Sequence, residues 1–383
     1  MKNFRKFLTE GGNASVYQDG KLVAQAEKID LSKIDRNAVT EQVKRMMYEL
    51  DAEFEKVYGI PIWEHLGMIA FGNVFAGSSR FFMDDEISDE EFKAHKPTVG
   101  DIDVQVPHAL KEPLDKLLVP GKIFGGMKYV GRADTSLQQL NTVWEATLSG
   151  IPVMIQVDFE PVEFIRGLPS PWSEFAHSAD WDDIKAGIKG VFHKYLIGAV
   201  DFAYQKPITV LTRKTLKPKK VDAHDYAFSV EKGVREKYVL AKDEKGKPIM
   251  VGGEQAFFEI DSKEADYITD VASIYEVLFR IVPSASDLQK FKSFTGVVDL
   301  IDAEFSGSQQ ALIADEFLKR CWGRGAQALE RDAPEIDAKA KWAAVNYLAD
   351  KLQMPSIIKK AELLVGEYYK SYKMSADRLK SSR

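Results

Sequence analysis

The run from Asp101 to Val106 reads Asp-Ile-Asp-Val-Gln-Val, and this alternation restricts the fold more than any other feature of the chain. A period of two predicts a β-strand whose successive side chains point to opposite faces. Ile102 and Val104 would anchor one face in the core, while Asp101 and Asp103 share the other face. Two parallel carboxylates repel each other and are stable only in water or beside a cation. The chain must therefore fold around a strand that carries a carboxylate pair.

A second alternating pattern predicts a β-hairpin from Leu140 to Val162. Its arms, Leu140–Leu148 and Ile151–Val162, flank Ser149-Gly150, a pair that is typical of tight turns. Asp158 lies in the second arm among alternating apolar residues. If this arm lies beside the first strand, Asp158 joins Asp101 and Asp103. Three clustered carboxylates suit a hard divalent cation, so we expect these three residues to bind Mg²⁺ or Mn²⁺.

A short turn, Gly77-Ser78-Ser79, precedes the carboxylates in the sequence. A glycine followed by small hydroxyl residues at the start of a helix presents N–H groups and hydroxyls to an anion. Arg80 follows directly and would add positive charge. We expect Gly77, Ser78, Ser79 and Arg80 to contact phosphates, although the same tripeptide is also an ordinary turn.

Three features follow one another along the chain: an apolar segment ending in Gly77-Ser78-Ser79, then Asp101-Ile102-Asp103, then Asp158 on a later strand. In this order of features the chain resembles the DNA polymerase beta-like nucleotidyltransferase superfamily. That superfamily includes poly(A) polymerases, CCA-adding enzymes, cyclic-dinucleotide synthases and toxin nucleotidyltransferases. The resemblance covers roughly residues 65–205. The segment between Ser79 and Asp101 is longer than is usual in the family, because an acidic stretch lies within it.

The resemblance implies two-metal phosphoryl transfer, in which a nucleoside monophosphate moves from a nucleoside triphosphate to a hydroxyl acceptor. Asp101, Asp103 and Asp158 would be the catalytic and metal-binding residues. Family members often place a basic residue against the triphosphate on the helix after the third carboxylate, and Lys189 is preferred here over Lys185 and Lys194. The sequence leaves open whether the nucleotide is ATP or another NTP, and whether the acceptor is RNA, protein or a small molecule.

The expected fold class is α+β, with a nucleotidyltransferase-type mixed sheet and flanking helices, a β-rich insert and a C-terminal helical domain. Of the 383 residues, 45% are hydrophobic and 29% are charged, which is typical of globular chains. Helical periodicity predicts helices over 36–58 and 182–204, and the C-terminal helices are expected at 262–282, 286–303, 310–322, 334–352 and 355–373. The expected domains are an N-terminal segment (1–34), the core (35–205), the insert (206–261) and the helical domain (262–383).

Two rival functions remain open at this point. A catalytically inactive chain could keep the fold as a structural or virion protein. Alternatively, the basic run Arg213–Lys220 could bind RNA or DNA backbone, although the net charge of −6 excludes a generic polyanion binder. A solvated linker is the simpler interpretation of that run. His193 and the single cysteine, Cys321, are interpreted as structural residues.

The first ten residues, Met1–Glu10, form a short basic and aromatic stretch without the apolar core of a secretory signal. The stretch resembles the capsid-targeting peptides of large tailed bacteriophages, which implies a phage protein in the host cytoplasm or packaged in the virion. A frayed N-terminal helix accounts for it equally well. No run approaches the ~18 apolar residues of a membrane helix, so cytoplasmic residence without a membrane partner is expected.

Overall fold

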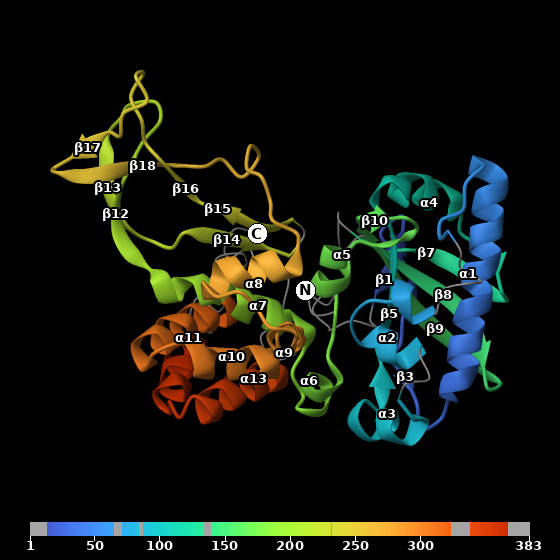
Figure 1. Ribbon diagram of the computed structural model, residues 1–383. Helices are drawn as coiled ribbons and strands as arrows, with labels where there is room; N and C mark the ends of the chain where they lie inside the picture. Colours follow the sequence, from blue (N-terminus) through green and yellow to red (C-terminus); the bar gives the residue numbers. More distant parts are fainter. Residues whose placement is uncertain are drawn as a thin grey trace, which may run out of the picture. The chain divides into compact units, whose positions relative to one another are not determined.

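The computed structural model describes residues 14–64, 71–83, 87–133, 139–230, 232–322 and 338–366. The predicted segment Met1–Glu10 and the last residues of the predicted helix 355–373 lie outside these ranges. The chain divides into two compact units, and the division falls after Gly187. Both units combine helices with strands, so the α+β class is confirmed at that level (Figure 1). No described helix combines the length and the apolar character needed to cross a membrane.

A five-stranded mixed sheet forms the centre of the first unit, with the strand order β5-β9-β8-β7-β6. β5 and β9 are parallel, and the other neighbours are antiparallel. The strands are β5 (Asp101–Pro107), β6 (Ile123–Phe124), β7 (Met127–Arg132), β8 (Leu140–Leu148) and β9 (Ile151–Val162). The predicted hairpin is confirmed: β8 and β9 begin and end at the predicted residues. Ser149 and Gly150 both have positive φ, which a two-residue hairpin turn of this kind requires.

The long helix α1 (Arg36–Tyr58) packs its apolar stripe against this sheet (Figure 1). Asp35 caps its first turn by accepting the N–H of Asn37, and Gly59 ends it in the left-handed region with φ 78°. The helix has the predicted bounds. The six apolar residues that the periodicity places on its inner face are all buried: Val39, Val43, Met46, Met47, Leu50 and Phe54.

Short elements complete the first unit. They are β1 (Ser15–Gln18), β2 (Lys21–Gln25), β3 (Ile29–Asp30), η2 (Phe71–Val74), α2 (Gly77–Met83), α3 (Asp89–His95), β4 (Thr98–Val99), η3 (His108–Leu110), α4 (Lys111–Leu117), β10 (Phe164–Ile165), β11 (Leu168–Pro169), α5 (Pro171–Ala176) and α6 (Trp181–Lys185). α2 begins at Gly77, so the predicted helix start at the serine turn is confirmed.

The predicted helix 182–204 is wrong. α6 ends at Lys185, Gly187 takes a φ of 74°, and a new helix starts at Gly190. Glycine adopts this left-handed conformation without a steric penalty and therefore ends a helix readily. The apolar periodicity belongs to two helices that the break separates, and the break marks the boundary between the two units.

The second unit contains a β-rich part and a helical part. Its strands are β12 (Lys206–Leu211), β13 (Pro218–Ala223), β14 (Tyr226–Ser229), β15 (Gly233–Glu236), β16 (Tyr238–Leu240), β17 (Met250–Val251) and β18 (Glu254–Glu259). Its helices are α7 (Gly190–Val200), η4 (Asp201–Tyr204), α8 (Val271–Phe279), α9 (Ala285–Lys290), α10 (Phe294–Glu304), α11 (Gly307–Trp322) and α13 (Ala338–Lys351), and residues 356–366, within the predicted helix 355–373, are also helical.

Two predicted C-terminal helices differ from the observed ones. Residues 262–270 are not helical, because Asp270 caps the start of α8 by accepting the N–H of Ser273. The predicted helix 286–303 is interrupted, since Ser293 accepts the N–H of Gly296 and starts a new helix there. Polar side chains that accept backbone N–H groups therefore start new helices within sequence segments whose apolar periodicity is continuous.

Candidate functional site

The three predicted carboxylates lie together in the first unit. β5 and β9 pair in parallel with Asp103 directly opposite Asp158, and Asp101 shares the face of Asp103. One carboxylate oxygen from each of Asp101, Asp103 and Asp158 lies within 4.8 Å of the other two. We call these three residues the carboxylate trio.

Apolar residues on the opposite face hold the carboxylate trio in place. Ile102 and Val104 of β5, and Val157 and Phe159 of β9, are fully buried in the core between the sheet and α1. Because side chains alternate along a strand, burial of these residues turns the aspartates to the other face. The predicted division of β5 into an apolar face and a carboxylate face is confirmed.

Asp158 is only 4% exposed, and its two oxygens have different surroundings. Oδ2 accepts a hydrogen bond from Gln156 Nε2 at 2.7 Å. Oδ1 is buried and has no hydrogen-bond partner among the described residues. Burial, followed by repulsion from Asp101, raises the pKa of Asp158 to about 8. A buried oxygen without a donor is costly for a protein, which indicates that another group completes this site.

Asp103 is held in a similar environment. Burial is the main cause that raises its pKa well above the ordinary value, and repulsion from Asp101, Glu160 and Asp158 adds to it. The Lys96 ammonium acts in the opposite direction and lowers the pKa. The described structure therefore gathers like charges at one point, and a cation bound there would stabilise all three carboxylates in their ionised form.

The donor set fits a hard divalent cation. All three ligands are carboxylate oxygens, which Mg²⁺ and Mn²⁺ prefer. The Oδ1 of Asp158 provides a second sign of fit, because it is a buried carboxylate oxygen of the trio without a hydrogen-bond partner among the described residues. The trio leaves the remaining ligand positions to water or to phosphate oxygens.

The serine turn is fixed against β5. Ala76 N donates to Asp103 O at 3.1 Å, and Ser79 Oγ accepts the N–H of Asp103 at 3.0 Å. Gly77 has a φ of 54°, and a Cβ added there would lie 3.7 Å from Asp103 Oδ2. The turn and the carboxylate strand therefore form one rigid piece, in which the backbone of Gly77 lies close to Asp103.

The backbone N–H groups of Gly77 and Ser79 point into the protein. Gly77 N donates to His177 O at 2.7 Å, and Ser79 N donates to Ala76 O at 3.1 Å. The Ser78 hydroxyl, which is also expected to contact phosphate, is half-buried and lies on the outside of the turn. It accepts a hydrogen bond from Lys96 Nζ. Arg80 is half-buried, and its Nη1 lies 3.8 Å from Glu174 Oε1.

Sequence reasoning missed three polar residues at this site. Lys96 follows α3 and contacts the serine turn. Glu160, two residues after Asp158 on the same strand, accepts a hydrogen bond from Gln139 Nε2 at 2.7 Å and lies 3.0 Å from His177 Nδ1. The alternation along β9 extends to Glu160 and could have identified it, whereas only the fold brings Lys96 and His177 to the turn.

The segment 172–181 is a connector packed through its aromatic side chains. Trp172 and Phe175 are buried, and Trp181 stacks on Phe92 with ring centroids 5.7 Å apart. His177 ends α5 within this segment. The connector therefore holds His177 and its carbonyl against Gly77.

The basic residues proposed for the triphosphate have different places. Lys189 is exposed at the start of α7 and belongs to the second unit, not to the unit that carries the carboxylate trio. Lys194 is buried, with Nζ 2.8 Å from His193 Nδ1, and His193 Nε2 lies 2.8 Å from Phe291 O. Burial lowers the pKa of His193 well below its ordinary value. The structural interpretation of His193 is confirmed.

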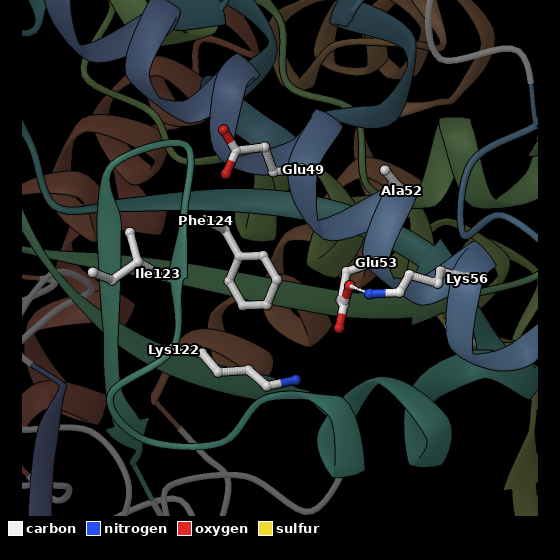
Figure 2. Close-up of a pocket in the computed structure, with 7 residues that line it drawn as sticks. All are labelled: Glu49, Ala52, Glu53, Lys56, Lys122, Ile123 and Phe124. Atoms are coloured by element: carbon white, nitrogen blue, oxygen red, sulfur yellow. Dashed lines mark hydrogen bonds and ion pairs between the residues drawn. The ribbon is translucent and has the colours of Figure 1, made fainter.

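A separate open cavity of about 380 Å³ lies between α1 and the start of the β6–β7 hairpin. Figure 2 shows the ion pair between Glu53 and Lys56 on α1 and the side chains of Lys122, Ile123 and Phe124 across from it. Glu49 also lines the cavity and fixes the hairpin by accepting the N–H of Gly125 at 2.6 Å. The cavity contains no residue of the carboxylate trio.

We compared the chain with family models, with curated proteins and with solved structures, and no match was found. The chemistry of this site therefore has to be inferred from its own residues. They are a rigid serine turn, a trio of partly and fully buried carboxylates, and a lysine that contacts the turn.

Proposed function

We propose that this chain is a metal-dependent nucleotidyltransferase, which moves a nucleoside monophosphate from an NTP to a hydroxyl acceptor. One observation carries the proposal: Asp101, Asp103 and Asp158 bring carboxylate oxygens within 4.8 Å of one another while Asp158 Oδ1 lacks a hydrogen-bond partner among the described residues. The resemblance of Gly77-Ser78-Ser79, Asp101-Ile102-Asp103 and Asp158 to the DNA polymerase beta-like superfamily supports the same function.

Mg²⁺ or Mn²⁺ would be held by Asp101, Asp103 and Asp158, and would supply neutralisation of the triphosphate charge and Lewis-acid polarisation of the reacting phosphate. The protein groups do the remaining work. Asp103 is positioned by Ser79, which fixes its backbone N–H. Preorganised carboxylates need no rearrangement when substrate binds, and this lowers the free energy of the transition state.

In the proposed reaction, the acceptor oxygen forms a bond to the α-phosphorus of the NTP. The bond between this phosphorus and the oxygen that bridges to the β-phosphate breaks, and pyrophosphate leaves with the electron pair. The acceptor hydroxyl loses its proton to the Asp158 carboxylate. This carboxylate suits the role because it lies beside Asp103 on the paired strand and is only 4% exposed.

The β- and γ-phosphates would be bound by the outer side of the serine turn. Ser78 Oγ and Lys96 Nζ already contact each other there, and Arg80 follows two residues after Ser78 in α2. A lysine and a hydroxyl side chain next to a metal site are a common way to hold a triphosphate. Lys96 replaces Lys189 as the first candidate, because it lies in the same unit as the carboxylate trio.

The test is incubation of the full chain with each of the four α-labelled NTPs and Mg²⁺, with and without total RNA. Transfer of label to RNA, to the protein or to a small molecule identifies the acceptor. Asp103→Asn should remove the transfer, whereas Glu145→Gln, an exposed carboxylate on β8 paired with Lys128 at 3.1 Å, should leave it intact.

A chain that kept the fold as an inactive structural protein would give a different result. It would transfer no label, and calorimetry would detect no NTP binding in the presence of Mg²⁺. Equal label transfer by the wild-type chain and by Asp103→Asn would also contradict the proposal.

A further inference from the structure

The hairpin formed by β12 and β13 concentrates positive charge. Residues 206–220 contain six lysine or arginine side chains and no acidic residue, although the whole chain has a net charge of −6. Lys214, Lys217 and Lys219 are exposed, and no described residue forms an ion pair with them. Residues 213–217 of the basic run form the exposed connection of this hairpin, as the linker interpretation expects, whereas residues 218–220 belong to β13, which pairs with β12 in regular antiparallel register.

The sheet that carries this hairpin has one covered and one open face. It has five strands, in the order β13-β12-β18-β16, with β17 also paired to β18. On the covered face, Leu211 and Ala256 pack with Ala241 in a small core. On the other face, the registers align Lys219, Val210, Phe257 and Leu240 across four strands. Val210, Phe257 and Leu240 are only partly buried, so this face offers accessible apolar surface beside Lys219.

A pocket of about 240 Å³ opens at this face. Three aromatic rings line it, Tyr226, Tyr238 and Phe257. The Arg280 guanidinium lies 4.8 Å from the Tyr226 ring centroid, and it holds Asp225 at 3.1 Å. Asp225 and Lys206, which also line the pocket, lie 3.6 Å apart. Aromatic faces flanked by fixed polar groups are the common way in which proteins hold an unstacked base.

We propose that the β12–β13 hairpin and the open face of its sheet bind a single-stranded nucleic acid. Lys214, Lys217 and Lys219 contact phosphates, and one base enters the pocket between Tyr226, Tyr238 and Phe257. The aromatic pocket favours a single strand, because the bases of a duplex are stacked and hide their faces. This binding goes beyond the proposed transfer reaction and does not rest on it.

The test measures fluorescence anisotropy of a labelled single-stranded oligonucleotide of mixed sequence with the full chain, over a range of salt concentrations. Three phosphate contacts predict that log K falls with log salt with a slope of about −2. The triple variant Lys214→Glu, Lys217→Glu and Lys219→Glu should bind at least about tenfold more weakly, with a shallower salt slope.

A matched control reverses the same number of charges elsewhere in this unit. Lys242, Lys245 and Lys247 are also exposed, but they precede Ile249 and Val251, which pack against the covered-face core. Lys242→Glu, Lys245→Glu and Lys247→Glu together should change affinity by less than about twofold. Equal weakening by both triple variants would overturn the proposal, because net charge alone would then account for binding.

The pocket has its own variants. Phe257→Ala should weaken binding about tenfold without changing the salt slope, since stacking and not charge is lost. Phe257→Trp keeps an aromatic face and should restore affinity, and thermal melting checks that both variants are folded. Affinity unchanged by Phe257→Ala, or equal affinity for a duplex of the same sequence, would remove the base pocket from the proposal.

Two further measurements separate this surface from the carboxylate trio and from a surface that binds an acidic protein segment. Asp103→Asn should bind the oligonucleotide like the wild-type chain, so that loss of transfer activity and loss of binding stay separate. Polyglutamate should compete weakly, because it lacks bases. Competition by polyglutamate as strong as that by the unlabelled oligonucleotide would overturn the proposal in favour of an acidic protein segment.

Discussion

The two five-stranded sheets of this chain differ in how they arrange side chains of like charge. In the first unit, the sheet around β5 and β9 gathers three carboxylates to within 4.8 Å, with Asp158 almost fully buried. In the second unit, the sheet around β12 spreads its lysines over exposed positions at its edge. Buried like charges cost folding free energy, whereas exposed like charges cost little and create a long-range field.

This difference separates two kinds of binding. The carboxylate trio is a short-range site, because its oxygens lie within 4.8 Å of one another and Asp158 is almost fully buried. The lysines of the hairpin form a long-range surface, which attracts an extended polyanion and whose strength falls with salt. The following predictions test whether the two sheets differ as much as their charge arrangement implies.

The largest expected effect is on turnover by the carboxylate sheet. Asp103→Asn removes one ligand charge and should lower the transfer rate at least about 10⁴-fold, about 5 kcal/mol of lost transition-state stabilisation. The fold should remain nearly intact, because the substitution removes repulsion. Steady-state kinetics combined with a melting curve measures both. A folded variant with wild-type kinetics would show that the trio does not perform the chemistry.

The second effect is the pH dependence of stability without metal. The pKa of Asp158 rises from its ordinary 3.8 to about 8 in the folded state, so the folded chain binds this proton more tightly than the unfolded chain. Stability from this group is therefore greatest below about pH 4 and falls as the pH rises to about 8. At about 1.4 kcal/mol per unit, the upper bound of the loss is about 6 kcal/mol.

Chemical denaturation at several pH values, with a chelator present, measures this loss. Asp158→Asn should make this fall in stability smaller, and the raised pKa of Asp103 accounts for the part that remains. Mg²⁺ should reduce the fall in the wild-type chain, because it binds only the folded, ionised site. Binding of Mg²⁺ should also release protons below pH 8. A wild-type stability that rises from pH 5 to pH 8 in the absence of metal would contradict the assigned environment of Asp158.

Two phenylalanines, one in each sheet, allow the contributions of apolar burial to the unfolding free energy to be compared. Phe159 of β9 is fully buried, whereas Phe257 of β18 is partly exposed on the open face. Phe159→Ala should cost about 3–5 kcal/mol of unfolding free energy, and Phe257→Ala less than about 1.5 kcal/mol. Urea unfolding measures both. Equal losses would mean that another element covers the open face.

The smallest expected effect concerns the link between the serine turn and β5. Ser79→Ala removes the acceptor for the buried N–H of Asp103 and should cost about 1–2 kcal/mol. Ser78→Ala should change stability by less than about 0.5 kcal/mol, because its hydroxyl contacts the flexible ammonium of Lys96. Urea unfolding distinguishes them, and a reversed order would place the rigid contact at Ser78.

The elements around the carboxylate trio could be predicted because their signals are local. The turn pair Ser149-Gly150 lies between two alternating runs, and Asp103 and Asp158 are each framed by buried apolar neighbours. Only the pairing of β5 with β9 is non-local. It could be anticipated because three carboxylates on half-buried strands need a common counter-ion.

The rest of the site depends on contacts that a linear pattern does not contain. Lys96 contacts Ser78 from a position outside any periodic segment, and His177 meets Glu160 through a helix end. The prediction of one helix over 182–204 was wrong because the apolar periodicity continues across Gly187. The left-handed backbone conformation of Gly187 ends the first helix. Within the basic run at 213–220, residues 218–220 became part of β13 because pairing with β12 satisfies their backbone groups, whereas residues 213–217 form the connection between the two strands.

The pairing of Asp103 with Asp158 also limits how this protein can vary. Inserting or deleting one residue between the Ser149-Gly150 turn and Asp158 would shift β9 by one position against its neighbours. That shift would point Asp158 into the core and bring Val157 and Phe159 to the surface. An insertion or deletion in this segment would therefore destabilise the hydrophobic core as well as displace the carboxylate. The buried apolar residues of β9 thus fix the strand register and, with it, the position of Asp158 on the opposite face.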